Sequence, residues 1–126
     1  MPYHQNLNPS TQTAGGAVRN RRLVKESGGK LVEGGAGADE IVAVSLEAAA
    51  ADGDTFACQN IDGNAVVEVE AGAAVAAGAP IASDAQGRAV TAASGHKVCG
   101  YARSDSSASA AGEIISVQAT RLADIA

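Results

Sequence analysis

Short runs of β-branched residues separated by glycine-rich turns are the feature that most limits what this chain can fold into. In VVEVEA, residues 66–71, the alternation places two valines, Val67 and Val69, on one face and the two glutamates on the other. That pattern predicts a half-buried strand with one wet side. Turn signals recur every 8–12 residues or so, a spacing typical of sandwiches and barrels. We therefore expect strands within NRRLVKE, KLVE, EIVAVSL, TFACQN, NAVVEVEA, RAVTAA, KVCGYAR and EIISVQATRL.

Two alanine-rich stretches, LEAAAADG and AGAAVAAGA, favour helix instead, since alanine is the best helix former. Both are short and flanked by glycine, and isolated helices below about 12 residues are marginal. We expect one helical turn near residues 46–52, and at most one or two short helices in all. The predicted fold class is all-β, a small barrel or sandwich.

Large apolar side chains are scarce in this chain. Hydrophobic residues make up 46% of it, but alanine alone accounts for almost a quarter of the residues and the only aromatic residues are Tyr3, Phe56 and Tyr101. Burying one methyl contributes about 0.8 kcal/mol, whereas a buried leucine or phenylalanine contributes about 1.5–3 kcal/mol. We therefore expect the isolated domain to be marginally stable and to gain stability by packing against other chains.

The N-terminal segment differs from the rest in polarity and charge. Residues 1–17 are polar and show no apolar period, which predicts an extended arm that orders on a partner, followed by a single β domain over residues 18–126. Residues 1–30 hold five of the nine Lys and Arg residues but only one of the fourteen Asp and Glu residues. This asymmetry indicates a basic arm and an acidic body, and two interpretations stay open: a charged contact surface or a basic strand that is simply solvated. Nucleic acid is not expected as a partner, because the pI is about 4.8 and no aromatic residues interleave with the basic ones.

No run approaches the roughly 18 apolar residues of a membrane span, so no membrane is expected as a partner. Cys58 and Cys99 are far apart, sit in apolar runs and form no metal-ligand pattern. We expect both to be reduced and buried, as suits a protein made in a cytoplasm.

The stretch PIASDAQGRAV, residues 80–90, could be a catalytic loop, a ligand loop or a hairpin turn. Aspartate and glycine at these positions favour a tight turn between two strands. A Ser83–His96–Asp84 site is conceivable, but two adjacent side chains would have to converge on one histidine. The acidic turns form no calcium loop. We therefore expect no enzyme activity, no cofactor, and no catalytic or metal-binding residues.

Two weaker patterns accompany these. EIVAVSLEAAAADGDTFACQ aligns with KVCGYARSDSSASAAGEIISVQ as a repeated strand–loop–strand unit. VEVEAGAAVAAGAPIAS resembles the swinging-arm domains that carry biotin or lipoate, but the following hairpin tip, DAQG, lacks the lysine that such domains modify. A β binding or carrier module without the modified lysine therefore remains the alternative function.

Three segments resemble the capsid cement, or head decoration, proteins of tailed bacteriophages: VRNRRLVKESGGKLVE, AGAAVAAGAPIASDAQGRAVTAASG and VCGYARSDSSASAAGEIISVQ. The most specific pieces are residues 78–90, 98–102 and 111–117. The resemblance implies a small, tulip-like β-barrel domain with an N-terminal arm, bound as a homotrimer to the major capsid protein on the outside of the head. It implies a structural virion protein, made in the host cytoplasm, that binds at capsomer junctions and stabilises the head against DNA packaging pressure. The residues expected to contact the capsid or a neighbouring subunit are Tyr3, His4, Leu7, Arg19, Arg21, Arg22 and Lys25.

Overall fold

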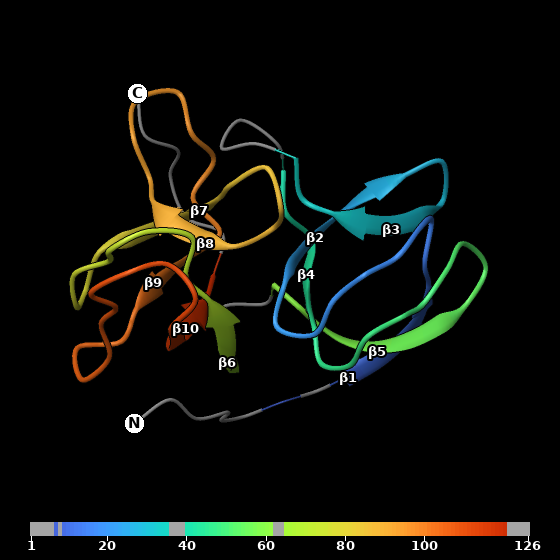
Figure 1. Cartoon of the computed structure of the whole chain (residues 1–126), viewed down its shortest axis with the longest axis horizontal. Helices are drawn as coiled ribbons and strands as arrows, with labels where there is room; N and C mark the ends of the chain where they lie inside the picture. The colour runs from blue at the N-terminus through green and yellow to red at the C-terminus, as the bar shows by residue number, and fades with distance from the viewer. Residues whose placement is uncertain (1–6, 8, 36–39, 62–64, 121–126) are drawn as a thin grey trace.

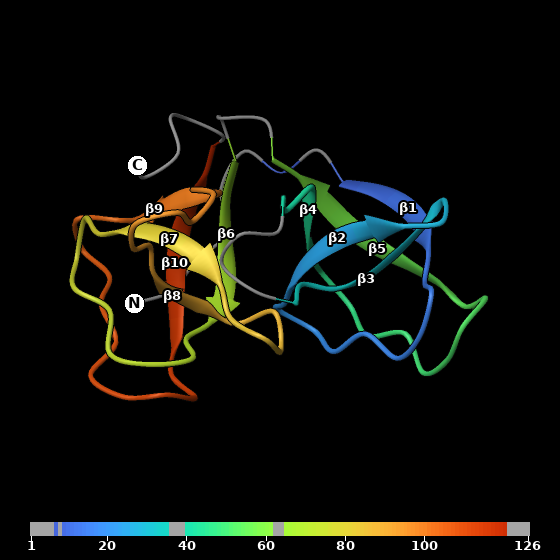
Figure 2. The ribbon, with the colours of Figure 1, turned by 90° about the horizontal axis from the view of Figure 1, so that it is seen from above.

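The computed structural model describes residue 7 and residues 9–35, 40–61 and 65–120. These residues form ten β-strands and no helix, arranged as two antiparallel five-stranded sheets. The sheets lie side by side along the long axis, one built from the N-terminal half of the chain and one from the C-terminal half (Figures 1 and 2). The prediction of an all-β fold is confirmed, and two separate sheets match the sandwich rather than the closed barrel.

The first sheet has the strand order β1-β5-β4-β2-β3. Its strands are β1 (Pro9–Thr13), β2 (Leu23–Ser27), β3 (Lys30–Glu33), β4 (Ala43–Ser45) and β5 (Thr55–Asn60). The second sheet has the order β6-β10-β9-β7-β8. Its strands are β6 (Ala65–Glu70), β7 (Pro80–Ser83), β8 (Ala89–Thr91), β9 (Gly100–Ala102) and β10 (Ile114–Ala119).

The two sheets are copies of one five-stranded unit, because adding five to each strand number of the first order gives the second. Isolated bridges repeat as well: Ala14–Leu31 and Val18–Ala49 in the first unit correspond to Ala71–Ala89 and Val75–Ala108 in the second. The repeated strand–loop–strand segment predicted from sequence is β4–β5 and β9–β10, two fifths of the full repeat. The wider repeat is also visible in the sequence, where TAGGAV (residues 13–18) is similar to EAGAAV (residues 70–75).

Two hydrophobic clusters fill the molecule. The larger cluster spans both sheets, with Leu23, Ile41 and Val44 from the first unit packed among the buried valines and alanines of the second. The smaller cluster lies within the first unit around Phe56, which is fully buried. Many core positions hold alanine, so the sheets approach closely but bury little apolar area per residue. The first unit therefore depends on the second for part of its core.

The expected strands KLVE and TFACQN match β3 and β5 residue for residue. In β6 the valine face is buried and Glu68 and Glu70 are half-buried, as the alternation predicted. The helical turn expected near residues 46–52 is wrong. Ala49 instead exchanges backbone hydrogen bonds with Val18, at 2.8 and 2.9 Å, so cross-strand pairing overrides the helix propensity of alanine.

Part of the segment predicted as an arm belongs to the first sheet. Residues 9–13 form β1, which pairs antiparallel with β5 along its whole length. The sequence PSTQT carries no apolar period because β1 is an edge strand, exposed or half-buried throughout. Its proline stands at the first position, where an edge strand tolerates a missing N–H.

Candidate functional site at the junction of the two sheets

The stretch PIASDAQGRAV is a hairpin, with β7 and β8 paired from Ile81–Thr91 to Ser83–Ala89. Asp84 organises its turn. One carboxylate oxygen accepts hydrogen bonds from the backbone N–H groups of Gln86 (2.9 Å) and Arg88 (2.8 Å). The other accepts from Arg88 Nε at 2.9 Å. A carboxylate that satisfies two backbone donors and a guanidinium holds the turn in one conformation.

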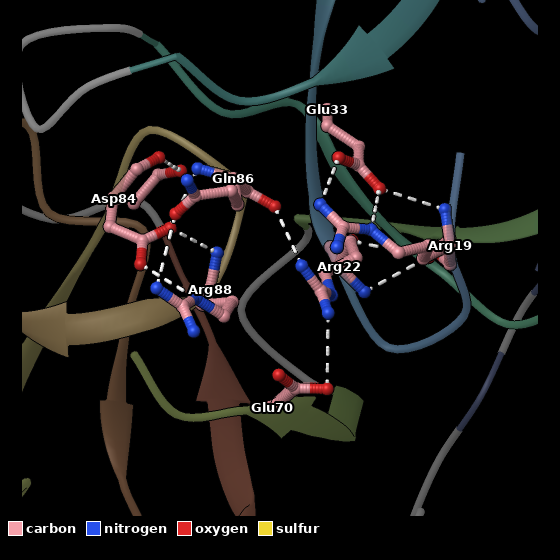
Figure 3. A network of polar contacts seen from close by, with 9 residues as sticks. Arg19, Arg22, Glu33, Glu70, Asp84, Gln86 and Arg88 are labelled. Carbon is pink, nitrogen blue, oxygen red and sulfur yellow. Dashed lines mark hydrogen bonds and ion pairs between the residues drawn. The ribbon is translucent and has the colours of Figure 1, made fainter. Parts of the chain in front are cut away.

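This turn packs against the first sheet (Figure 3). Leu23 N donates to the carbonyl oxygen of Gly87 at 2.7 Å, and Arg22 Nη1 donates to the carbonyl oxygen of Gln86 at 3.1 Å. Gly87 has a φ of 76°, and a Cβ there would lie 2.6 Å from the Leu23 carbonyl oxygen. Glycine is therefore required both by the turn and by the close approach of the two sheets. The turn serves as the docking element between the two units.

Arg22 is the central side chain of the junction. Only 6% of its side chain is exposed, and Nη2 lies 3.1 Å from Glu70 Oε1 on β6. The neighbouring backbone reinforces the contact, since Glu70 N donates to the carbonyl oxygen of Arg21 at 3.0 Å. Arg21 Nε in turn lies 3.2 Å from Glu68 Oε1. A guanidinium this deeply buried needs such partners, because an unpaired charge there would be strongly destabilising.

Arg19 makes a more exposed pair within the first unit. Its Nε and Nη2 bind the two oxygens of Glu33 at 3.0 and 2.9 Å, and its backbone N–H adds a third contact at 2.8 Å. Burial of Glu33 disfavours its charged form, but the hydrogen bonds from Arg19 outweigh that cost and hold the pKa of the carboxyl below its ordinary value. The Arg19 side chain remains 56% exposed, so the pair is a surface feature.

The structure thus gives each basic residue of the predicted contact set a definite place. Arg21 and Arg22 join the two units, Arg19 pairs within the first unit, and Lys25 on β2 lines a shallow groove. Leu7 is half-buried and packs against the larger hydrophobic cluster. Tyr3 and His4 lie outside the described residues.

The sequence analysis assigned these arginines to contacts with other chains and did not predict that their acidic partners lie in the same chain. The wet face of VVEVEA was recognised, but its glutamates were read as solvated. The sequence does contain a signal for these ion pairs. One segment carries the adjacent residues Arg21 and Arg22, and another is a strand in which glutamates alternate with valines. Residue spacing alone could not show that these two segments meet.

Ser83, Asp84 and His96 are each engaged locally. Ser83 Oγ donates to the carbonyl oxygen of Asp84 at 2.9 Å, and His96 Nδ1 accepts from Ala93 N at 3.0 Å within its own turn. No group of three or more His, Cys, Asp or Glu residues suited to a metal ion occurs among the described residues. Both cysteines are buried free thiols, as predicted, and burial raises the pKa of Cys58. In the same described ranges no helix has the length and hydropathy to span a bilayer.

The two sheets thus form a two-unit β module that is joined by a buried ion pair and a glycine turn. The family model for phage cement proteins matches residues 4–119, and the chain belongs to that family. It is accordingly a capsid-associated structural protein of a phage virion. No curated protein matches the chain.

A solved structure confirms the fold. The chain is similar to the head fiber gp8.5 N base in bacteriophage phi29, with a TM-score of 0.68 and 20% sequence identity. The similarity covers 93% of this chain and 98% of that one, so both five-stranded units are included.

Proposed function

We propose that this protein binds the outer surface of the phage head at junctions between capsomers and stabilises the shell against the pressure of packaged DNA. The observation that carries the proposal is the match to the phage cement family across residues 4–119. The partner is the major capsid protein, and binding follows assembly in the host cytoplasm. The role is mechanical and involves no catalysis.

The junction between the two units supports this role. A protein that bridges capsomers must transmit force without yielding internally. The buried Arg22–Glu70 pair, the Leu23–Gly87 hydrogen bond and the shared hydrophobic cluster bind the units to each other. Such coupled contacts resist separation of the two units, so we expect the units to move as one body. Small contact energies repeated over many copies on a shell then add through multivalency.

The similar fold of a head fiber base supports attachment to the head, since that protein is by its name a structure of the phage head. We further propose that the protein binds as a homotrimer. The poor supply of large apolar side chains, with 46% hydrophobic residues dominated by alanine, favours stabilisation by neighbouring copies.

The test is co-sedimentation of purified protein with expanded heads and with unexpanded precursor shells. We expect saturable binding to expanded heads, three copies per binding position, and a higher temperature of DNA release from decorated heads. A variant lacking residues 1–8 leaves β1 intact and tests the arm separately. Saturable binding to precursor shells alone, or unchanged DNA release from saturated heads, would contradict a reinforcing role.

A further inference from the structure

The two units contact each other head to tail, because each unit contributes a different surface. The first unit contributes an entering segment, residues 21–23, which leads into β2. The second contributes a receiving surface, formed by the outer edge of β6 and the β7–β8 turn. Such a contact leaves one copy of each surface unused, unlike a two-fold contact that consumes both. The unused copies are an entering segment in the second unit and a receiving surface in the first.

The entering segment of the second unit is residues 78–80, which lead into β7. Its backbone repeats that of the first entering segment. Gly78 N donates to the carbonyl oxygen of Ala102 at 3.0 Å, and Arg21 N likewise donates to that of Ser45 at 3.1 Å. Both residues also have a positive φ, 81° at Gly78 and 61° at Arg21. The second unit therefore presents the same backbone shape, with its carbonyl groups in the corresponding directions.

The receiving surface of the first unit is formed by β1 and the β2–β3 turn. Thr13 directly precedes the bridged residue after β1, as Glu70 directly precedes the bridged residue after β6. Gly29 stands two residues before the bridged residue of β3, and Gly87 stands two before that of β8. Both glycines have a positive φ, 84° and 76°. β1 and this turn lie at one end of the long axis, and the loop that leads into β7 lies at the other (Figures 1 and 2).

The receiving surface is covered in the second unit and open in the first. Gly87 is buried, and a Cβ there would lie 2.6 Å from the Leu23 carbonyl oxygen. Gly29 is exposed, and a Cβ there would meet nothing within 4 Å. Glu68 is half-buried, but its counterpart Thr11 is exposed. The outer edge of β1 is therefore an open strand edge, the kind of surface to which another chain can pair.

The backbone groups that would repeat the internal hydrogen bond are available on both unused surfaces. The internal contact contains one backbone bond from β6 to the entering segment, at 3.0 Å. Ala14 N donates to the carbonyl oxygen of Asp54 next to β5, so Thr13 N, one residue earlier, faces away from β5. Among the described residues no backbone group accepts from Thr13 N or donates to the Gly78 carbonyl oxygen. The chain thus carries, at its two ends, a donor and an acceptor that a second copy can pair.

The side chains of the two unused surfaces also match in charge. In the internal contact two arginines lie opposite two glutamates, as the pairs Arg21–Glu68 and Arg22–Glu70. On the unused surfaces the corresponding positions all hold uncharged residues: Gly78, Ala79, Thr11 and Thr13. Because the charge is missing on both sides, no charged group is left unpaired when these surfaces meet. A charged segment of another protein would leave its charge unpaired at this position, so the surface favours the uncharged segment of a second copy.

We propose that β1 and the β2–β3 turn of one copy bind residues 78–80 of another copy head to tail, with Thr13 N donating to the Gly78 carbonyl oxygen. Pro80 stands where Leu23 donates a backbone N–H in the internal contact, and proline has no N–H. Its ring packs instead on the exposed glycine backbone of the β2–β3 turn. The inference rests on the homotrimer of the proposed function and assigns its contact, since a head-to-tail contact that closes forms a ring.

The test places a charge on the receiving surface and then supplies its partner. Thr11→Glu introduces an unpaired carboxylate at the position that corresponds to Glu68. Adding Gly78→Arg supplies a guanidinium at the position that corresponds to Arg21. Thr91→Glu is the matched control, because Thr91 is an exposed threonine on β8. Self-association is measured by sedimentation velocity over a range of protein concentrations, and urea midpoints check that each variant folds.

We expect the wild-type protein to form a trimer in a concentration-dependent way. Thr11→Glu should raise the apparent dissociation constant about tenfold, whereas Thr91→Glu should change it by less than about twofold. The double variant Thr11→Glu/Gly78→Arg should return to within about threefold of the wild type. Amide exchange at Thr13 should slow as the trimer forms, because its N–H then has an acceptor.

Three results would overturn the head-to-tail contact while leaving capsid binding intact: a wild-type protein that is monomeric at every concentration, equal effects of the two glutamate variants, or no rescue by Gly78→Arg. If exchange at Thr13 slows only on heads while the free protein stays monomeric, the capsid protein is the occupant and the inference is also wrong. A wild-type trimer that does not bind heads would refute the proposed function and leave the contact between copies standing.

Discussion

The Arg22–Glu70 pair is predicted to determine whether the two units behave as one body. In Arg22→Met the aliphatic volume is kept but the charge and both contacts, to Glu70 and to the Gln86 carbonyl, are lost. Breaking a fully buried pair costs about 3–5 kcal/mol, and a lost hydrogen bond to a charged group about 1.5–3 kcal/mol. Because the Glu70 side chain is 26% exposed, water can replace part of what it loses. We therefore expect a loss of about 2–3 kcal/mol in the free energy of unfolding.

The measurement is urea unfolding followed by far-ultraviolet circular dichroism, with calorimetry alongside. For a domain of this size the expected loss lowers Tm by roughly 10 °C. Glu70→Gln and the double variant complete a cycle, which should give a coupling energy of about 1–2 kcal/mol. Arg19→Ala is the matched control, since that arginine is 56% exposed and its pair should be worth about 0.5–1 kcal/mol. If Arg22→Met costs no more than Arg19→Ala, the reasoning from burial is wrong.

Three further predictions concern the β7–β8 turn, the loss of stability at acid pH and the hydrophobic core. Gly87→Ala should destabilise by about 2–4 kcal/mol and Gly78→Ala by about 1 kcal/mol, because both have positive φ but only Gly87 approaches a backbone carbonyl; equal losses in urea unfolding would refute the close-approach argument. Arg19 lowers the pKa of Glu33, so the stabilisation by this pair is present above the ordinary carboxyl pKa and is lost as pH falls through the pKa of the folded state. The variant Glu33→Gln should therefore show a smaller fall in the urea midpoint between pH 5 and 3 than the wild type. An equal fall in both proteins would contradict this prediction. Phe56→Ala should cost about 3–5 kcal/mol, since this fully buried ring is the centre of the smaller cluster; a loss below 1.5 kcal/mol by the same assay would show that the alanine-rich surroundings collapse around the gap.

Local pattern was sufficient for most of the strands. The alternation in VVEVEA and the β-branched runs KLVE and TFACQN identified strands because the periodicity of two is written in consecutive residues. β1 was missed, since the polar segment PSTQT becomes a strand only by pairing with β5. The expected helical turn failed for the same reason, as Ala49 pairs with Val18 across the sheet.

Only part of the candidate site could be predicted from the sequence. The basic residues drew attention through their clustering, and the Asp-Gly turn was recognised as a hairpin connection. Neither pattern showed that Arg22 would be buried against this turn and Glu70, because burial depends on how the two sheets meet. The repeat was also underestimated, since most corresponding positions, such as Lys25 and Ala82, share a backbone position but no chemistry.

What the sequence by itself determined was the class: alternation and glycine turns require short strands, and the scarcity of large side chains limits how much stability one chain can build alone. What only the tertiary structure decided was the duplication of the sheet and the pairing of Arg22 with Glu70. Both features depend on residues about 50 positions apart in the sequence. Local periodicity carries no information about contacts between residues so far apart in the sequence. Those contacts are determined by how one sheet packs against the other.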